Sequence, residues 1–220
     1  YAIGNYSDWD EKWMDLSKEA WQNFLVERAK AFKKRGAMGL YIDNLDVVEE
    51  FKSRKLYGPA RKILKHIRKE TGLYLMVNGA DYFVTKCIKD KVVHFQAIQQ
   101  EEVFTRITSI SKNEAGSQTA AEKKRLKAYC ANIKKHGISV YLLEYRANAA
   151  NAAKITAFCK KYGLFGAVFG ICETALTGKE SYSLSCTEYN WDLEAIEQLE
   201  NEYLLVEGKH CYLICYETKE

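Results

Sequence analysis

The chain has 220 residues, of which 47% are hydrophobic and 28% are charged, and its formal net charge is +4. This size and composition predict one ordinary globular core, without a low-complexity segment or a recognisable linker. No apolar run approaches the roughly 20 residues of a membrane-spanning helix, so we expect no membrane span. No secretory signal is visible, and the chain starts with Tyr1 rather than Met, which is consistent with a processed or truncated start.

The positive charge does not predict a protein that binds nucleic acid. Pairs of lysines occur at the ends of predicted helices, at Lys33-Lys34, Lys134-Lys135 and Lys160-Lys161. Lysines at these positions complement the negative end of the helix dipole and face water. The sequence contains no stripe of arginines and aromatics and no glycine-rich phosphate-binding loop, so a nucleic-acid or phosphate-ligand protein is the weaker interpretation.

Seven cysteines and four histidines offer little sign of cross-linking or metal binding. The cysteine count is odd and no CxxC pair occurs, which favours buried, reduced thiols over a disulfide framework. The histidines show no ligand spacing to one another or to cysteine, so no zinc site is predicted.

A helix, a glycine and then an apolar run recur four times along the chain. The glycines are Gly36, Gly72, Gly137 and Gly163, and a basic segment precedes each of them. Glycine just past a helix adopts the left-handed conformation at low cost, and an apolar run after it is typical of a buried strand. The recurrence therefore predicts alternating helices and strands.

The predicted elements follow one another in a regular order. Strands are expected at residues 13–16, 38–42, 73–77, 92–99, 138–143 and 164–171, with a further β-like run at 210–216. The helices between them have predicted starts at Ser17, at Pro59 in a first turn, at the capping box of Thr119 and Glu122, and at Asn148 or Asn151. A short helix is expected around residues 82–88 and an acidic one around residues 193–202.

This order predicts an α/β fold, which we interpret as a (β/α)8 TIM barrel. A complete barrel has eight strands and about 250 residues, so we expect this chain to lack its first one or two βα units. Residues 1–220 are treated as a single, partial barrel domain, in which residues 176–220 form an unassigned C-terminal extension or closing element.

Carboxylates and amides follow the apolar runs. Asp43, Asn44 and Asp46 come directly after the run that ends at residue 42. Asn78, then Glu101 and Glu102, then Glu144 and Tyr145 follow later runs, and Trp9, Trp13 and Asp15 precede them all. Because the carboxyl ends of barrel strands share one face, we expect these side chains to line one cleft. Such a set can hold sugar hydroxyls and stack on sugar rings.

Several of these residues also have a purely structural interpretation. An acid after a strand is often a helix N-cap, which applies to Asp46 and to Glu101 or Glu102. Trp9 and Trp13 could equally be buried in the core, which is the common place for tryptophan, and Trp21 on its apolar helix stripe is predicted to be core. Asn78-Gly79 is equally compatible with a simple turn.

Five segments, taken in order, are similar to those of a known family. They are Trp9-x-x-x-Trp13-x-Asp15, Gly39-Leu40-Tyr41-Ile42-Asp43-Asn44-Leu45-Asp46, Val77-Asn78-Gly79, Gln100-Glu101-Glu102-Val103-Phe104 and Val140-Tyr141-Leu142-Leu143-Glu144-Tyr145. Through them the chain resembles glycoside hydrolase family 114, the endo-α-1,4-polygalactosaminidase-like barrels. The resemblance covers roughly residues 1–175 and does not extend to the family's first strand.

The resemblance implies cleavage of α-1,4-linked galactosamine or N-acetylgalactosamine polysaccharide by an Asp and a Glu. These map to Asp43 and to Glu101 or Glu102, and Glu101 is preferred because the family pattern places the acid three residues before an aromatic residue, here Phe104. The family also implies a secreted or cell-surface protein. A non-catalytic carbohydrate-binding barrel is the alternative.

We expect the reaction to need no metal and no organic cofactor. Glu101 would protonate the leaving oxygen, and Asp43 would be the nucleophile of a retaining reaction with the carboxyl groups about 5 Å apart; a gap of roughly 6.5–9.5 Å would mean inversion. The residues expected to bind the substrate are Asp46, Asn44, Asn78, Glu102, Glu144, Tyr145, Trp9, Trp13 and Asp15.

Overall fold

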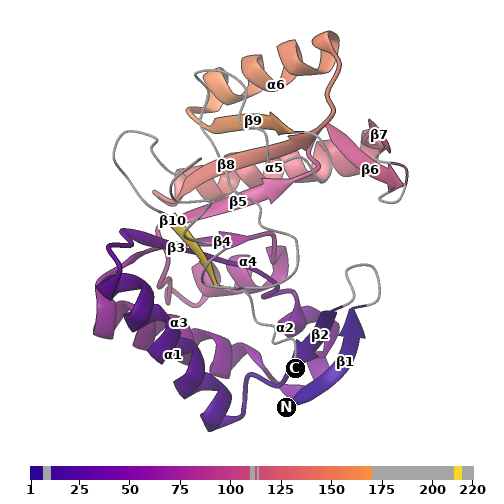
Figure 1. The fold of residues 1–220 in the computed structure, drawn as a ribbon. Helices are drawn as coiled ribbons and strands as arrows, with labels where there is room; N and C mark the ends of the chain where they lie inside the picture. Colours follow the sequence, from indigo (N-terminus) through magenta and orange to yellow (C-terminus); the bar gives the residue numbers. More distant parts are fainter. Residues whose placement is uncertain (7–10, 110–111, 113, 170–210, 215–220) are drawn as a thin grey trace. The chain divides into compact units, whose positions relative to one another are not determined.

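A computed structural model describes residues 1–6, 11–109, 112, 114–169 and 211–214 (Figure 1). These residues form two compact units that divide between Gln96 and Ala97, and residues 211–214 belong to the first. Within the described ranges, no helix is long and apolar enough to cross a membrane.

The first unit contains three parallel strands with β3 in the middle. β3 (Gly39–Ile42) pairs with β4 (Tyr74–Asn78) on one side and with β10 (Cys211–Ile214) on the other. All four residues of β3 are buried, as expected for a central parallel strand. Gly39 is required by close packing, because a Cβ atom there would lie 2.9 Å from the carbonyl oxygen of Tyr74.

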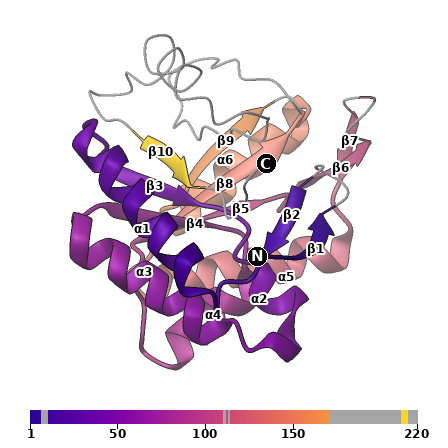
Figure 2. The same ribbon diagram turned by 60° about the horizontal axis from the view of Figure 1, so that its bottom comes forward.

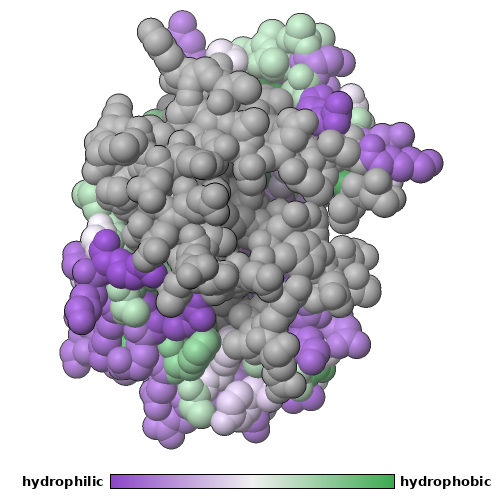
Figure 3. Space-filling model, viewed as in Figure 1, coloured by the Kyte–Doolittle hydropathy of each residue, from purple (hydrophilic) through white to green (hydrophobic). Residues whose placement is uncertain are grey.

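Helices α1 (Glu19–Lys34) and α3 (Tyr57–Thr71) of this unit pack against each other (Figure 1). Ile63, Leu64 and Ile67 form the buried stripe of α3, and the helix ends at Gly72 in the left-handed conformation. The surface of this region in Figure 3 is mainly hydrophilic, with hydrophobic patches between the hydrophilic side chains. Shorter helices follow β3 and β4: α2 (Val47–Glu50), the 3-10 turn η2 (Lys52–Arg54) and α4 (Asp81–Lys89).

An antiparallel hairpin opens the first unit. β1 (Ala2–Tyr6) pairs with β2 (Glu11–Met14), which Figure 2 shows beside each other. The sequence predicts a strand at residues 13–16 in the βα series, whereas β2 ends at Met14 and its partner is antiparallel. The chain turns after Met14 because the Asp15 carboxylate accepts hydrogen bonds from the backbone N–H (3.0 Å) and the hydroxyl (2.6 Å) of Ser17. Ser17 is therefore not the N-cap of α1, a position that Lys18 occupies.

The second unit also contains three parallel strands. β8 (Ser139–Tyr145) lies between β5 (Ala97–Glu101) and β9 (Phe165–Phe169), with α5 (Ala120–Lys135) and α6 (Ala149–Tyr162) in the connections. The predicted N-caps of both helices are confirmed: Thr119 accepts a hydrogen bond from the Glu122 N–H (3.2 Å), and Asn148 accepts one from the Asn151 N–H (2.9 Å). The capping box at Thr119 is only half formed, because the Thr119 N–H donates to the Gln118 side chain (2.8 Å) and the Glu122 carboxylate pairs with Arg125.

A second antiparallel hairpin was not predicted. β6 (Thr105–Ser109) pairs with β7 (Glu114–Ser117) in the connection between β5 and α5. β5 itself begins at Ala97 instead of residue 92, because the chain at Val92 is still bound to the end of α4, where the Val92 N–H donates to the Cys87 carbonyl oxygen (2.9 Å).

The parallel strands and intervening helices confirm the predicted α/β class. The strands predicted at 38–42, 73–77, 138–143 and 164–171 agree with β3, β4, β8 and β9 over the described residues, and β10 falls within the run predicted at 210–216. Cys87, Cys130 and Cys159 are buried free thiols, as predicted. Closure of the barrel and the loss of its first units stay predictions, and the helix predicted at residues 193–202 lies outside the described residues.

Candidate active site

Asp43 is fixed at the carboxyl end of β3 by two hydrogen bonds. The parallel register pairs Ile42 with Val77, so Asp43 comes opposite Asn78. The Asn78 side-chain amide (3.0 Å) and the Asn44 backbone N–H (2.8 Å) both donate to Oδ1 of Asp43. Burial raises the pKa of Asp43, while these two hydrogen bonds oppose the rise by stabilising the carboxylate. Asn44 itself is buried with φ 59°, a left-handed turn that ends the strand.

Asp46 is a second carboxyl group in the same turn. Its Oδ1 accepts a hydrogen bond from the Ala80 N–H (3.2 Å), and Gly79 before it has a left-handed φ of 52°, which favours glycine. Burial of the carboxyl group, followed by the negative charge of Asp43, raises the pKa of Asp46 to about 7, although the residue keeps exposed surface that weakens the effect.

Glu101 is the last residue of β5, in the second unit. Leu143 of β8 lies opposite Glu101, and Tyr145 lies two residues further along the same face. The Tyr145 hydroxyl donates to Oε2 of Glu101 (2.7 Å), so the neighbouring strand orients this carboxyl group.

Glu102 is turned into the β6–β7 hairpin. Its φ is 60°, its backbone N–H donates to the Leu143 carbonyl oxygen (3.0 Å), and its carboxylate accepts from the Ile107 N–H. Burial raises the pKa of Glu102, opposed by the hydrogen bond from Ile107 and the charge of Arg106. The Glu102 carboxylate is engaged in holding the hairpin, so Glu101 is the better candidate of the two for a catalytic role.

Glu144 has no solvent-exposed surface. Its carboxylate accepts from the Phe104 N–H (3.0 Å to each oxygen) and from the Thr105 N–H and hydroxyl (2.8 Å each). Burial raises the pKa of Glu144 to about 6 in spite of these hydrogen bonds. This arrangement favours a supporting role over the direct sugar contact that the sequence predicts.

The predicted residues near the N-terminus lie in and beside the first hairpin. Trp13 is half-buried, stacks on Tyr6 (ring centroids 4.6 Å apart) and meets the edge of Phe51 at 6.3 Å. Asp15 is buried, accepts hydrogen bonds from Ser17 and lies within 3.8 Å of the charged groups of Lys18 and Arg54. Its carboxylate therefore stabilises the turn between β2 and α1. Trp9 lies outside the described residues, and Trp21 is core, 3% exposed, as predicted.

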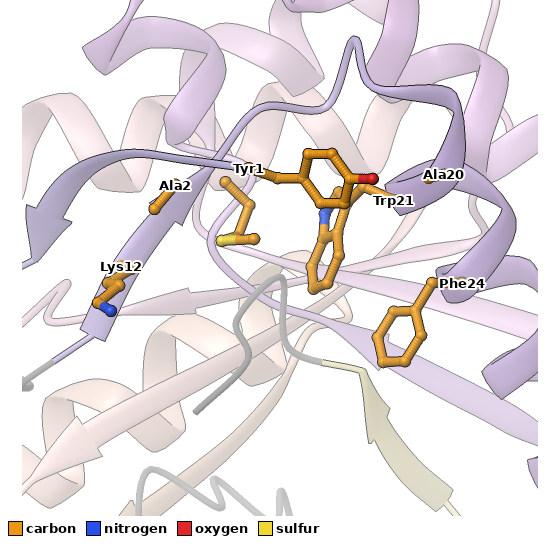
Figure 4. Close-up of a pocket in the computed structure, with 7 residues that line it drawn as sticks. Tyr1, Ala2, Lys12, Ala20, Trp21 and Phe24 are labelled. Atoms are coloured by element: carbon orange, nitrogen blue, oxygen red, sulfur yellow. The ribbon is translucent and has the colours of Figure 1, made fainter. Parts of the chain in front are cut away.

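A surface pocket of about 390 Å³ lies elsewhere in the first unit (Figure 4). It is lined by Tyr1, Ala2, Lys12, Met14, Ala20, Trp21 and Phe24. None of these lining residues is an acid, so they supply none of the carboxylate chemistry predicted at the strand ends. Among the residues that the structure describes, no group of three or more His, Cys, Asp or Glu side chains is arranged to hold a metal ion.

Sequence reasoning missed Thr105 and Gln118. The Thr105 hydroxyl donates to Glu144 and accepts from the Tyr145 N–H (2.9 Å), while the Gln118 side chain donates to the Glu102 carbonyl oxygen (3.0 Å). These contacts join segments that are distant in sequence, and no local pattern around Thr105 or Gln118 predicts them.

Residues 2–189 match the sequence model of glycoside-hydrolase family GH114. The chain belongs to this family. In fold, it is similar to the glycoside hydrolase domain of PelA from Pseudomonas aeruginosa, with 18% identity and a TM-score of 0.59 over 72% of this chain and 63% of that one. A glutamate-to-alanine variant of the same domain gives 17% identity and a TM-score of 0.58 over the same shares of the two chains.

The other comparisons add little to the family match. The matched region of this chain spans just under two thirds of each PelA domain structure. Streptococcus suis SuiB matches with a TM-score of only 0.42, at 12% identity over 90% of this chain and 43% of that one, which supports no conclusion about function. No curated protein matches this chain.

Proposed function

We propose that this protein is a glycoside hydrolase that cleaves α-1,4-linked galactosamine or N-acetylgalactosamine polysaccharide with two carboxyl groups. The observation that carries the proposal is the family membership of residues 2–189, combined with the two oriented acids, Asp43 and Glu101, at the carboxyl ends of parallel strands. In barrels of this class the carboxyl ends of the strands form the active site.

Asp43 and Glu101 have different roles in this proposal. Asp43, which accepts hydrogen bonds from Asn78 and Asn44 on Oδ1, would act as the nucleophile. Glu101 would protonate the leaving oxygen and later take a proton from water, with Tyr145 orienting its carboxyl group. This is the retaining route; a water-sized gap between the two acids would make the reaction inverting instead.

The remaining polar residues would bind sugar or support the acids. Asp46, Asn44, Asn78 and Tyr145 would bind the sugar. The stacked Trp13–Tyr6 pair and Trp9 offer aromatic faces for sugar rings. Asp15, Glu102 and Glu144 would support the turns from which these residues project. Family membership also favours a secreted or cell-surface protein.

The experiment is reducing-end release from a panel of amino-sugar polymers, with and without N-acetyl groups. We expect wild-type protein to hydrolyse the α-1,4-galactosamine members, and Asp43→Asn and Glu101→Gln each to lower the rate at least about a thousandfold. Glu27→Gln, on the exposed face of α1, is the matched carboxyl-to-amide control and should keep the wild-type rate.

Two outcomes would contradict the proposal in different ways. Full hydrolysis by Asp43→Asn would remove Asp43 from the chemistry. Polymer binding by wild-type protein without release of reducing ends would instead indicate a carbohydrate-binding barrel.

A further inference from the structure

Glu144 is a buried ionisable group for which the described part of the chain shows no ion pair. The described residues give it no lysine or arginine, and its hydrogen bonds come from Phe104 and Thr105. The ionisable neighbour on α6 is Cys159, whose thiol pKa is raised to about 11 by burial and then by the charge of Glu144. A carboxylate is costly to bury, so its four hydrogen bonds are the reason it is tolerated here.

All four hydrogen bonds act on the segment that directly follows Glu101. The chain reverses at Glu102, whose left-handed φ of 60° is unfavourable for a residue with a side chain. Glu102 is held through its N–H by Leu143 and through its carbonyl oxygen by Gln118, and Glu144 holds the next turn at Phe104 and Thr105. Phe104 is also fixed against Phe158, with ring centroids 5.6 Å apart. The backbone on which Glu101 sits is thus immobilised on its C-terminal side.

The Thr105 hydroxyl connects the Glu144 carboxylate to the residue that holds the Glu101 carboxyl group. Its proton goes to Oε2 of Glu144, and its lone pair accepts the N–H of Tyr145. The same Tyr145 donates its phenol proton to Glu101. Glu144 is therefore linked to Glu101 by hydrogen bonds at Thr105 and at the Tyr145 phenol, which the covalent frame of Tyr145 joins.

We propose that Glu144 and Thr105 are positioning residues for Glu101: together they set the direction of the Tyr145 phenol and the turn at Glu102, and so aim the Glu101 carboxyl group. Neither residue touches substrate in this scheme. The inference rests on the proposed hydrolase function, in which Glu101 transfers the proton. Misplacement of a reacting group by about 1 Å costs on the order of a hundredfold in rate, so a positioning device of this kind is measurable.

The test compares Thr105→Val, Thr105→Ser and Glu144→Gln with wild-type protein in the reducing-end assay. Valine keeps the shape of threonine and removes the hydroxyl, whereas serine keeps the hydroxyl. We expect Thr105→Val to lower kcat at least about tenfold with KM nearly unchanged, and Thr105→Ser to restore most of the lost kcat. Thr108→Val, an exposed position on β6, is the matched control and should behave as wild type.

The outcomes separate the two proposals. If wild-type protein hydrolyses the polymer and both Thr105→Val and folded Glu144→Gln keep its kcat, the positioning role is overturned and the hydrolase function stands. A fall in kcat that Thr105→Ser does not restore also overturns it, because the hydroxyl is then not responsible. Wild-type protein inactive on the whole panel overturns the hydrolase function and this inference with it. Should Glu144→Gln fail to fold, the threonine variants decide.

Discussion

The buried carboxyl group of Glu144 should make the stability of the protein depend on pH in a specific direction. Its pKa rises from an ordinary value of 4.5 to about 6 in the folded chain. At pH 7 the folded protein holds an ionised group that would be easier to ionise in the unfolded chain. At about 1.4 kcal/mol per pKa unit, the difference of about 1.5 units costs about 2 kcal/mol.

The sign follows from proton binding. Between pH 4.5 and 6 the folded chain binds more protons at Glu144 than the unfolded chain does, so stability falls as pH rises through this window. The cost of about 2 kcal/mol is fully present above pH 6 and is relieved as pH drops towards 4.5. A carboxyl group with a lowered pKa would behave in the opposite way.

The assay is urea denaturation of wild-type protein and Glu144→Gln at several pH values between 4.5 and 8. Asp43, Asp46 and Glu102 also have raised pKa values, so the quantity to follow is the difference between the two proteins at each pH. Glutamine at position 144 cannot ionise. It also loses hydrogen bonds, which changes the free energy of unfolding of the variant by the same amount at every pH. We expect the wild-type protein to lose about 2 kcal/mol relative to the variant as pH rises. A difference that stays flat across the range would refute the burial argument.

Two further predictions concern the strands of the first unit. Gly39→Ala should lower the free energy of unfolding by about 1–3 kcal/mol, because its Cβ atom would lie 2.9 Å from the Tyr74 carbonyl oxygen. Gly58→Ala in α3, with nothing within 4 Å of the added Cβ, should be neutral or stabilising by up to about 1 kcal/mol; equal effects in urea denaturation would exclude the packing explanation. Asn78→Ala removes a hydrogen bond that lowers the pKa of Asp43, so the acidic limb of the kcat/KM profile should move to higher pH, and an unmoved limb would mean that Asp43 does not set it.

Repeating βα joints were predictable because their signals are local. A basic helix end, a glycine at the C′ position and an apolar run lie within a dozen residues of one another, and the left-handed φ values of Gly72 (67°) and Gly163 (65°) agree with that pattern. The caps at Thr119 and Asn148 were visible for the same reason.

The two hairpins escaped prediction because their strands lack a strong alternation of apolar and polar residues. β7 consists of Glu114, Ala115, Gly116 and Ser117, none of which favours a strand. Its conformation comes from pairing with β6, a tertiary effect that a local pattern does not contain. The antiparallel pairing of β2 was missed similarly, because the aromatic residues around Trp13 suit either kind of strand.

The candidate acids were predictable by position, but their individual roles were not. A carboxylate at a strand end has the same appearance in the sequence whether it faces solvent or backbone. The structure separates Glu101, held by a phenol, from Glu144, surrounded by backbone N–H groups 39 and 40 residues away in sequence. Only the pairing of β5 with β8 brings these groups together.

Gln118 forms hydrogen bonds across the base of the long connection between β5 and α5. Its backbone N–H donates to the Phe104 carbonyl oxygen (2.9 Å) and its side chain donates to that of Glu102 (3.0 Å), so both ends of the β6–β7 insertion are tied together at its base. Because the closure entropy of such a loop grows only slowly with its length, the segment beyond the tie can be shortened, lengthened or exchanged at small thermodynamic cost. New recognition loops can therefore be grafted at this position, while the two hydrogen bonds of Gln118 continue to hold the chain next to Glu101.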